Sequence, residues 1–136
     1  MGHQLGAATP SEPMSLFQKG NFQLASGAVS TFKIECDALT DEDLECIAYL
    51  LFQRIPHEFA EVVGVPTGGV RLAKAMEKYI TPGYSPTLIV DDVFTTGGSF
   101  DRFIKEKGYD KMRYMAAVIF ARHEPPEWIT PLFIMS

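Results

Sequence analysis

The chain has few of the features that mark extracellular, membrane-spanning or nucleic-acid-binding proteins. Its 136 residues include only two cysteines, Cys36 and Cys46, and neither has the neighbouring histidine that a zinc site would need. No apolar run approaches the roughly 20 residues that span a bilayer. The 17 acidic residues outnumber the 12 basic ones, and the net charge of −5 argues against nucleic acid as the main partner. We therefore expect a cytoplasmic protein with no nucleic-acid and no membrane partner.

Length and composition suit one globular domain. Apolar residues make up 46% of the chain, which is ordinary for a protein with a packed core. Residues 1–14 show no charged region followed by an apolar stretch, so they do not resemble a signal peptide, and we expect a flexible tail there. The domain is then predicted to cover residues 15–136.

The first part of the domain is predicted to be a β-hairpin. Residues 15–20 suggest a short helix that ends at Gly20. After it, apolar residues alternate with polar ones over 22–24 and again over 32–36, with a turn between them. This alternation is typical of two paired strands with one exposed face.

Helices and strands then alternate along the rest of the chain. Thr40, with three acids directly after it, predicts the start of a helix that ends before Pro56. Cys46 falls on the apolar face of this helix, where we expect it to be buried, and the sequence leaves open a disulfide with Cys36. The alternation predicts an α/β domain whose parallel sheet is flanked by helices. Further strands are expected at 59–65, 87–93, 115–121 and 132–135, and further helices at 70–79 and 100–107.

One stretch, residues 87–99, carries most of the information about function. Its apolar start predicts a buried strand that ends in two adjacent acids, Asp91 and Asp92. Ligands of open α/β sheets bind at the carboxyl ends of strands, and the start of the next helix presents N–H groups and a positive dipole to an anion. The stretch lacks the lysine of a Walker A loop and the glycine fingerprint of a dinucleotide site. It therefore offers acceptors for sugar hydroxyls, followed by a cradle for a phosphate. The cradle consists of Thr95, Thr96, Gly97, Gly98 and Ser99.

This stretch resembles the motif with which type I phosphoribosyltransferases bind 5-phosphoribosyl-1-pyrophosphate (PRPP). In that family the paired acids hold the 2- and 3-hydroxyls of the ribose, which implies this role for Asp91 and Asp92. The loop after them holds the 5-phosphate, which implies that role for residues 95–99. The resemblance also implies Mg²⁺, bound through the substrate with the two acids nearby and with no direct protein ligand.

The wider resemblance is to orotate phosphoribosyltransferases and covers most of the chain. The hairpin at Leu16–Leu39 looks like the hood that covers the base in that family, and residues 22–30 match its phrase F-x-L-x-S-G-x-x-S. Phe32 and Arg122 are then candidates for base contacts, although Phe32 can equally fill the core and Arg122 can equally pair with an acid. The pyrophosphate loop of the family corresponds to Pro66, Thr67, Gly68 and Gly69, which can also be a plain turn between strand and helix.

The chain departs from the family after the helix that adjoins the pyrophosphate loop. In the family, this helix leads to a further strand and a long, mobile, lysine-rich loop, and the loop closes over the site with a catalytic lysine. Here only residues 81–86 separate that helix from the next strand. We therefore expect a sheet with one strand fewer, no lid, and no assignable catalytic residue. Arg71 and Lys74 can add positive charge near the loop, but a solvated surface position is the alternative for both.

Together these features imply a reduced type I phosphoribosyltransferase domain. The implied reaction is transfer of a phosphoribosyl group from PRPP to a nitrogenous base, as in orotate phosphoribosyltransferase, in nucleotide biosynthesis or salvage. Without the lid we expect slow transfer or none. Two alternatives stay open: a PRPP- or nucleotide-binding regulatory protein with little catalysis, and a phosphoribosyltransferase for another base. A homodimer is a further expectation.

Overall fold

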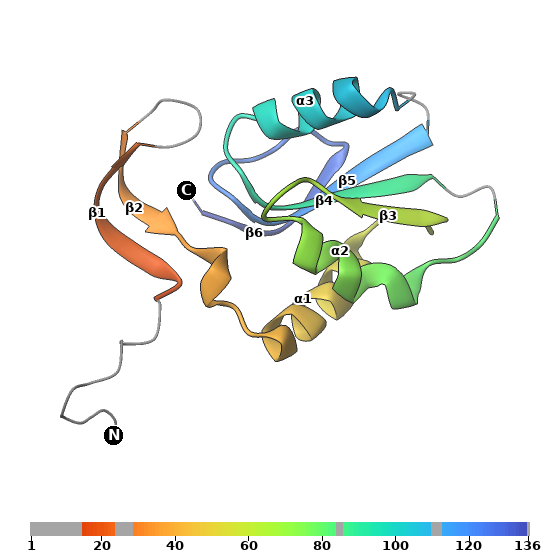
Figure 1. The fold of residues 1–136 in the computed structure, drawn as a ribbon, viewed down its shortest axis with the longest axis horizontal. Coiled ribbons are helices and arrows are strands. Elements are labelled where there is room, and N and C mark those ends of the chain that lie inside the picture. The colour runs from red at the N-terminus through yellow and green to blue at the C-terminus, as the bar shows by residue number, and fades with distance from the viewer. Residues whose placement is uncertain (1–14, 24–28, 84–85, 110–112, 136) are drawn as a thin grey trace.

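The computed structural model describes residues 15–23, 29–83, 86–109 and 113–135, which form a hairpin beside a layered α/β unit (Figure 1). The hairpin pairs β1 (Phe17–Gln23) with β2 (Val29–Ile34) in antiparallel fashion. The main sheet has four parallel strands in the order β3-β4-β5-β6. These strands are β3 (Glu61–Gly64), β4 (Thr87–Phe94), β5 (Tyr114–Ala121) and β6 (Ile129–Ile134). The helices are α1 (Asp41–Arg54), α2 (Val70–Met76) and α3 (Gly98–Lys107), with short 3-10 helices η1 (Cys36–Ala38) and η2 (Glu77–Tyr79). The predicted α/β class and parallel sheet are confirmed.

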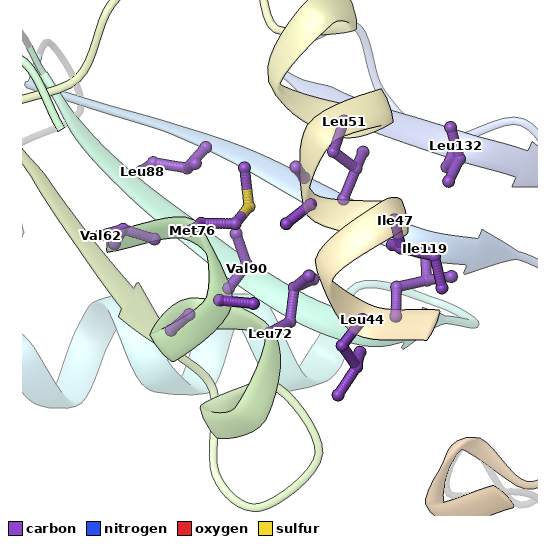
Figure 2. Close-up of a cluster of buried hydrophobic side chains, with 14 of the residues drawn as sticks. Leu44, Ile47, Leu51, Val62, Leu72, Met76, Leu88, Val90, Ile119 and Leu132 are labelled. Carbon is purple, nitrogen blue, oxygen red and sulfur yellow. The ribbon is translucent and has the colours of Figure 1, made fainter. Parts of the chain in front are cut away.

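Helices cover both faces of this sheet. The larger apolar cluster joins α1 and α2 to one face and includes Leu51 and Leu88 (Figure 2). A second cluster joins α3 to the other face and includes Ile89 and Phe100. Successive side chains of a strand point to opposite faces, which is why neighbours such as Leu88 and Ile89 enter different clusters. Burial on both faces explains the long apolar runs of the central strands. No helix in the described part of the chain has the length and apolar character needed to cross a membrane.

The start of α1 is determined by its own sequence. The Thr40 hydroxyl accepts a hydrogen bond from the Asp43 N–H at 3.1 Å, and the Asp43 carboxylate accepts one from the Thr40 N–H at 2.9 Å. This reciprocal capping box satisfies two N–H groups that a helix start otherwise leaves open. The predicted burial of Cys46 is wrong, because its thiol is exposed and free. Residues two apart lie on nearly opposite sides of a helix, so the buried position of Leu44 turns Cys46 toward solvent.

The predicted short helix at residues 15–20 is also wrong, whereas the hairpin is confirmed. β1 begins at Phe17, which lies opposite Ile34 of β2. Gly20, expected to end a helix, instead has a φ of 151° inside a bulge, where the register shifts between Lys19 and Phe22. So short a helix is unstable on its own, whereas the strand gains a partner along its length.

The connection from η2 to β4 runs along the amino end of the sheet. Within it, the Thr81 N–H donates to the Phe59 carbonyl at 2.8 Å, and the Ala60 N–H donates to the Pro86 carbonyl at 3.1 Å. Phe59 and Ala60 directly precede β3, so both bonds tie the connection to the edge where the parallel strands begin. The described residues between η2 and β4, which exclude 84 and 85, contain no strand. Ligands of such sheets bind at the opposite edge, away from the described ends of this connection.

Candidate functional site

Two acids stand at the carboxyl end of β4. Asp91 is only 6% exposed, and Asp92 is half-buried. The Asp92 N–H donates to Asp91 Oδ1 at 2.8 Å, and the Val93 N–H donates to Asp92 Oδ1 at 2.8 Å. Both side chains are therefore fixed at the strand end by the backbone that carries them.

Burial controls the protonation of Asp91. Its pKa rises from the ordinary 3.8 to about 8, first because burial removes water and then because of the hydrogen bond and negative charge of the Asp92 carboxylate. The N–H of Asp92 opposes this rise in pKa by stabilising the ionised form. The raised pKa favours the protonated form of Asp91, which can donate as well as accept a hydrogen bond and so suits contact with a hydroxyl group.

The loop after β4 opens helix α3. Gly97 has a φ of 87°, in the left-handed region that favours glycine. A side chain at this position would also be crowded, because a Cβ built there would lie 3.1 Å from the Phe94 ring. The N–H groups of residues 95–99 donate to no backbone acceptor within the described residues. Open N–H groups at the positive end of a helix favour an anion. The hollow inside the loop measures only about 10 Å³, so a phosphate would have to lie against the outer surface of the loop.

The turn between β3 and α2 presses against the end of β4. The Val65 N–H donates to the Val90 carbonyl at 2.9 Å, and the Gly69 N–H donates to the Val65 carbonyl at 2.8 Å. A Cβ added to Gly68 would overlap the Asp92 carboxylate, so glycine permits the close approach of this turn to the acid. The predicted pyrophosphate loop therefore touches the predicted ribose-binding acid.

A cavity of about 380 Å³ joins the turn, β4 and the segment after the hairpin. Thr67, Gly68 and Asp92 line one part of it. Its size falls in the range of about 300–1,000 Å³ that is usual for small-molecule sites. The structure thus brings part of the predicted pyrophosphate loop and one predicted ribose acid into a single hollow. The other lining residues are Glu35, Cys36, Asp37, Leu44, Val70, Arg71 and Ile119.

Known structures share this architecture, although no family model and no curated protein sequence matches the chain. The orotate phosphoribosyltransferase from Aeropyrum pernix matches 88% of this chain and 89% of its own with a TM-score of 0.69 at 21% identity. The chain has the type I phosphoribosyltransferase fold. The UMP synthase of Leishmania donovani matches 88% of this chain with a TM-score of 0.69 at 16% identity, and the match spans 34% of that longer chain. The Mycobacterium tuberculosis H37Rv orotate phosphoribosyltransferase in complex with PRPP matches 84% of this chain and 86% of its own, with a TM-score of 0.61 at 14% identity.

Other predicted residues lie elsewhere on the phosphoribosyltransferase fold. Pro66 and Ser99 share a second cavity, of about 250 Å³, with Arg102 of α3. Arg122 follows β5, is half-buried, and donates its backbone N–H to the Phe94 carbonyl at 3.0 Å. Burial lowers the pKa of its guanidinium, which does not line the larger cavity. The backbone of Phe32 lies in β2, but its side chain falls outside the described features.

The sequence interpretation missed three cavity residues, Glu35, Cys36 and Asp37. They directly follow β2, so the resemblance of the hairpin to a hood was the signal that pointed to this segment. Burial raises the pKa of the Cys36 thiol to about 12, and the nearby Asp92 and Glu35 carboxylates add to the rise. Among the described residues, no three acid, cysteine or histidine side chains form a metal-binding group.

Proposed function

We propose that this chain binds PRPP together with Mg²⁺ and transfers the phosphoribosyl group slowly to a nitrogenous base, with orotate as the first candidate. The observation that carries the proposal is the close approach of Gly68 to Asp92 at the end of β4. It puts the candidate sites for the pyrophosphate and the ribose of one ligand side by side. The tuberculosis enzyme of the same fold was crystallised with PRPP, which makes this ligand the natural one to test.

Each part of PRPP has a candidate partner. Asp91 and Asp92 would hold the ribose hydroxyls, residues 95–99 the 5-phosphate, and residues 66–69 the pyrophosphate. Mg²⁺ would be held mainly by ligand oxygens, because it accepts one or two carboxylates together with phosphates and water. In the transfer, the bond from ribose C1 to the pyrophosphate oxygen breaks, pyrophosphate leaves with the electron pair, and a nitrogen of the base forms the new bond to C1.

Slow transfer is expected from the position of the connection at residues 81–86. Its described ends are tied to the amino edge of the sheet through Phe59 and Ala60, and its sequence contains no lysine. We therefore expect from it neither a cover nor a lysine at the opposite edge. A lid normally excludes water and completes the catalytic groups. Donors aimed at developing charge typically contribute about 10²–10³-fold to the rate.

Binding is tested by calorimetric titration with PRPP and Mg²⁺ of the wild type and the double variant Asp91→Asn, Asp92→Asn. An ordinary hydrogen bond contributes about 0.5–1.5 kcal/mol and one to a charged group about 1.5–3 kcal/mol, so the double variant should lose roughly tenfold or more in affinity. Asp101→Asn, an exposed change on α3, serves as the control. A correctly folded double variant with unchanged affinity for PRPP would refute the assigned role of the acids.

Transfer is tested by measuring pyrophosphate release with PRPP, Mg²⁺ and each of several bases. We expect turnover well below the ordinary enzyme range of about 1–10³ per second. Turnover within that range would show that the lid is replaced or dispensable. PRPP binding with no release for any base would instead favour the alternative of a PRPP-binding regulatory protein, which the tethered connection also supports.

A further inference from the structure

One basic side chain lines the cavity that contains the candidate pyrophosphate loop. Arg71 belongs to α2, directly after that loop, and no other lysine or arginine of the described residues lines this cavity. Three acidic side chains, from Glu35, Asp37 and Asp92, line it as well. An anionic group that enters the cavity therefore finds a single cation among several carboxylates.

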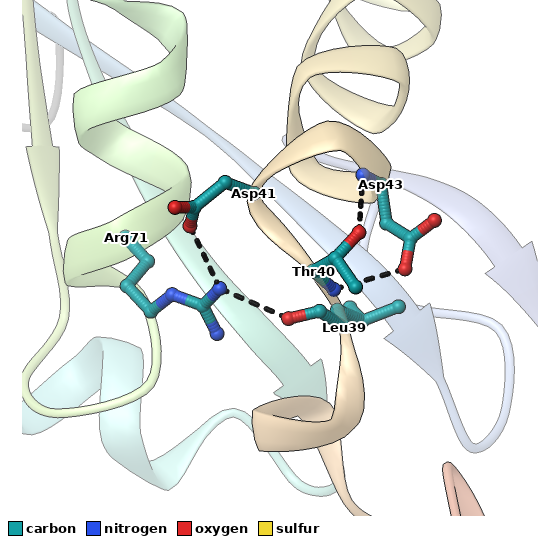
Figure 3. A network of polar contacts seen from close by, with 5 residues as sticks. All are labelled: Leu39, Thr40, Asp41, Asp43 and Arg71. Carbon is teal, nitrogen blue, oxygen red and sulfur yellow. Dashed lines mark hydrogen bonds and ion pairs between the residues drawn. The ribbon is translucent and has the colours of Figure 1, made fainter.

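Contacts with the start of α1 hold this arginine in place (Figure 3). Arg71 Nη2 donates to the Leu39 carbonyl at 2.9 Å and to Asp41 Oδ1 at 3.1 Å. Asp41 is the first residue of α1 and lies between Thr40 and Asp43, the two residues of the capping box that fixes this helix start. Toward the described residues, Arg71 makes no hydrogen bond through Nη1 or Nε, so those donors remain for a ligand.

We propose that Arg71 binds the pyrophosphate of PRPP and that Asp41 and the Leu39 carbonyl position it for this contact. A guanidinium fits two phosphate oxygens at once, and fixing one nitrogen lowers the entropy lost when the others bind. This inference rests on the proposed function, because it names the residue that recognises one end of the same ligand. Arg71 would thus provide a fixed positive charge next to the candidate pyrophosphate loop, where the family uses a lysine of the lid.

Lys74 provides a matched control on the same helix. It carries the same charge as Arg71 and is exposed, but it does not line the cavity. From the sequence, both Arg71 and Lys74 could either lie on the solvated surface or contact the ligand. The structure separates them, because only Arg71 is both held by α1 and part of the cavity wall.

The experiment measures the affinity of wild type, Arg71→Ala, Arg71→Lys and Lys74→Ala for two ligands by calorimetry with Mg²⁺ present. PRPP carries the pyrophosphate, whereas ribose 5-phosphate lacks it. Arg71→Ala should bind PRPP about tenfold or more weakly while its affinity for ribose 5-phosphate changes less than about twofold. Arg71→Lys should fall between, since lysine cannot bind two oxygens in a fixed plane. Lys74→Ala should match the wild type for both ligands.

A fourth variant, Asp41→Asn, tests the positioning role, because it keeps the charge of Arg71 but removes the ion pair. It should weaken PRPP binding less than Arg71→Ala does and leave ribose 5-phosphate binding unchanged, with circular dichroism confirming the fold. Unchanged PRPP affinity in Arg71→Ala overturns the inference, and so does an equal loss for both ligands, which indicates a structural role. A wild type that binds neither ligand contradicts the proposed function itself and the inference with it.

Discussion

The stability of the wild type should fall as pH rises, because of the buried Asp91 carboxyl. Replacing Asp91 by asparagine should remove this pH dependence. The side chain is 6% exposed, and its pKa lies at about 8, raised by burial and then by the adjacent Asp92 carboxylate. Between pH 3.8 and about 8 the unfolded chain releases this proton while the folded chain keeps it. The folded state therefore binds more protons than the unfolded state in this range. The contribution of Asp91 to the free energy of unfolding is complete below pH 3.8 and is lost as pH rises toward about 8.

The size of this effect is set by proton linkage. A difference of one bound proton changes the free energy of unfolding by about 1.4 kcal/mol per pH unit. From pH 5 to pH 7, Asp91 alone should lower the free energy of unfolding by roughly 2–3 kcal/mol, a large share of the usual total of about 5–15 kcal/mol. Asparagine has nearly the same shape and does not titrate, and its Oδ1 can still accept the hydrogen bond from the Asp92 N–H. The difference in stability between variant and wild type should grow by this amount over the same pH range.

Urea unfolding followed by circular dichroism at pH 5, 6 and 7 measures the effect. Asp101→Asn, at an exposed position of α3, is the control and should follow the wild type. Parallel pH profiles for wild type and Asp91→Asn would show that Asp91 is already ionised in the fold, and the reasoning from burial would be wrong.

Three further predictions concern single contacts. Thr40→Ala removes the capping bond of α1 and should cost about 1 kcal/mol of stability, whereas Thr40→Ser should cost little, as thermal unfolding can show. Gly68→Ala puts a methyl group into the Asp92 carboxylate and should destabilise the fold by about 1–3 kcal/mol in urea unfolding; an unchanged midpoint would mean that the loop moves aside freely. A thiol reagent should label Cys46 in the native protein and Cys36 only after unfolding, which mass spectrometry can follow, because Cys36 is buried with a pKa of about 12.

The sheet could be predicted because its strands have strong local signals. β5 is buried on both faces and reads as an unbroken apolar run, and β4 shows the same signal up to Asp91. The start of α1 was equally clear, because Thr40 and the acids after it satisfy helix N–H groups through side chains close in sequence. The predicted boundaries of helices differ from the observed ones where the backbone conformation of a single residue sets the boundary. The left-handed conformation of Gly97 lets α3 begin at Gly98, two residues before the predicted start.

The features that the sequence did not reveal depend on contacts between distant segments. The first part of β1, residues 17–20, was mistaken for a helix, because only pairing with β2 makes this segment extended. Cys46 was assigned to the wrong side of α1, since one step of 100° per residue decides which side of a helix meets the sheet. Arg71 and Lys74 could not be distinguished without knowing that α1 starts beside α2.

The charges of the site explain why a cation is needed at one end of the ligand more than at the other. The 5-phosphate would meet the positive end of α3 and open N–H groups, and a protonated Asp91 adds no negative charge there. The pyrophosphate would meet the carboxylates of the 380 Å³ cavity, with Arg71 as the one positive side chain among its lining residues. Mg²⁺ must then supply the remaining positive charge, so omitting it should weaken the binding of PRPP far more than that of ribose 5-phosphate. The same balance would limit the proposed reaction, because negative charge that develops on the leaving pyrophosphate would be met mainly by residues 66–69, Arg71 and the metal ion. The described ends of the connection from η2 to β4 are tied to the opposite end of the sheet.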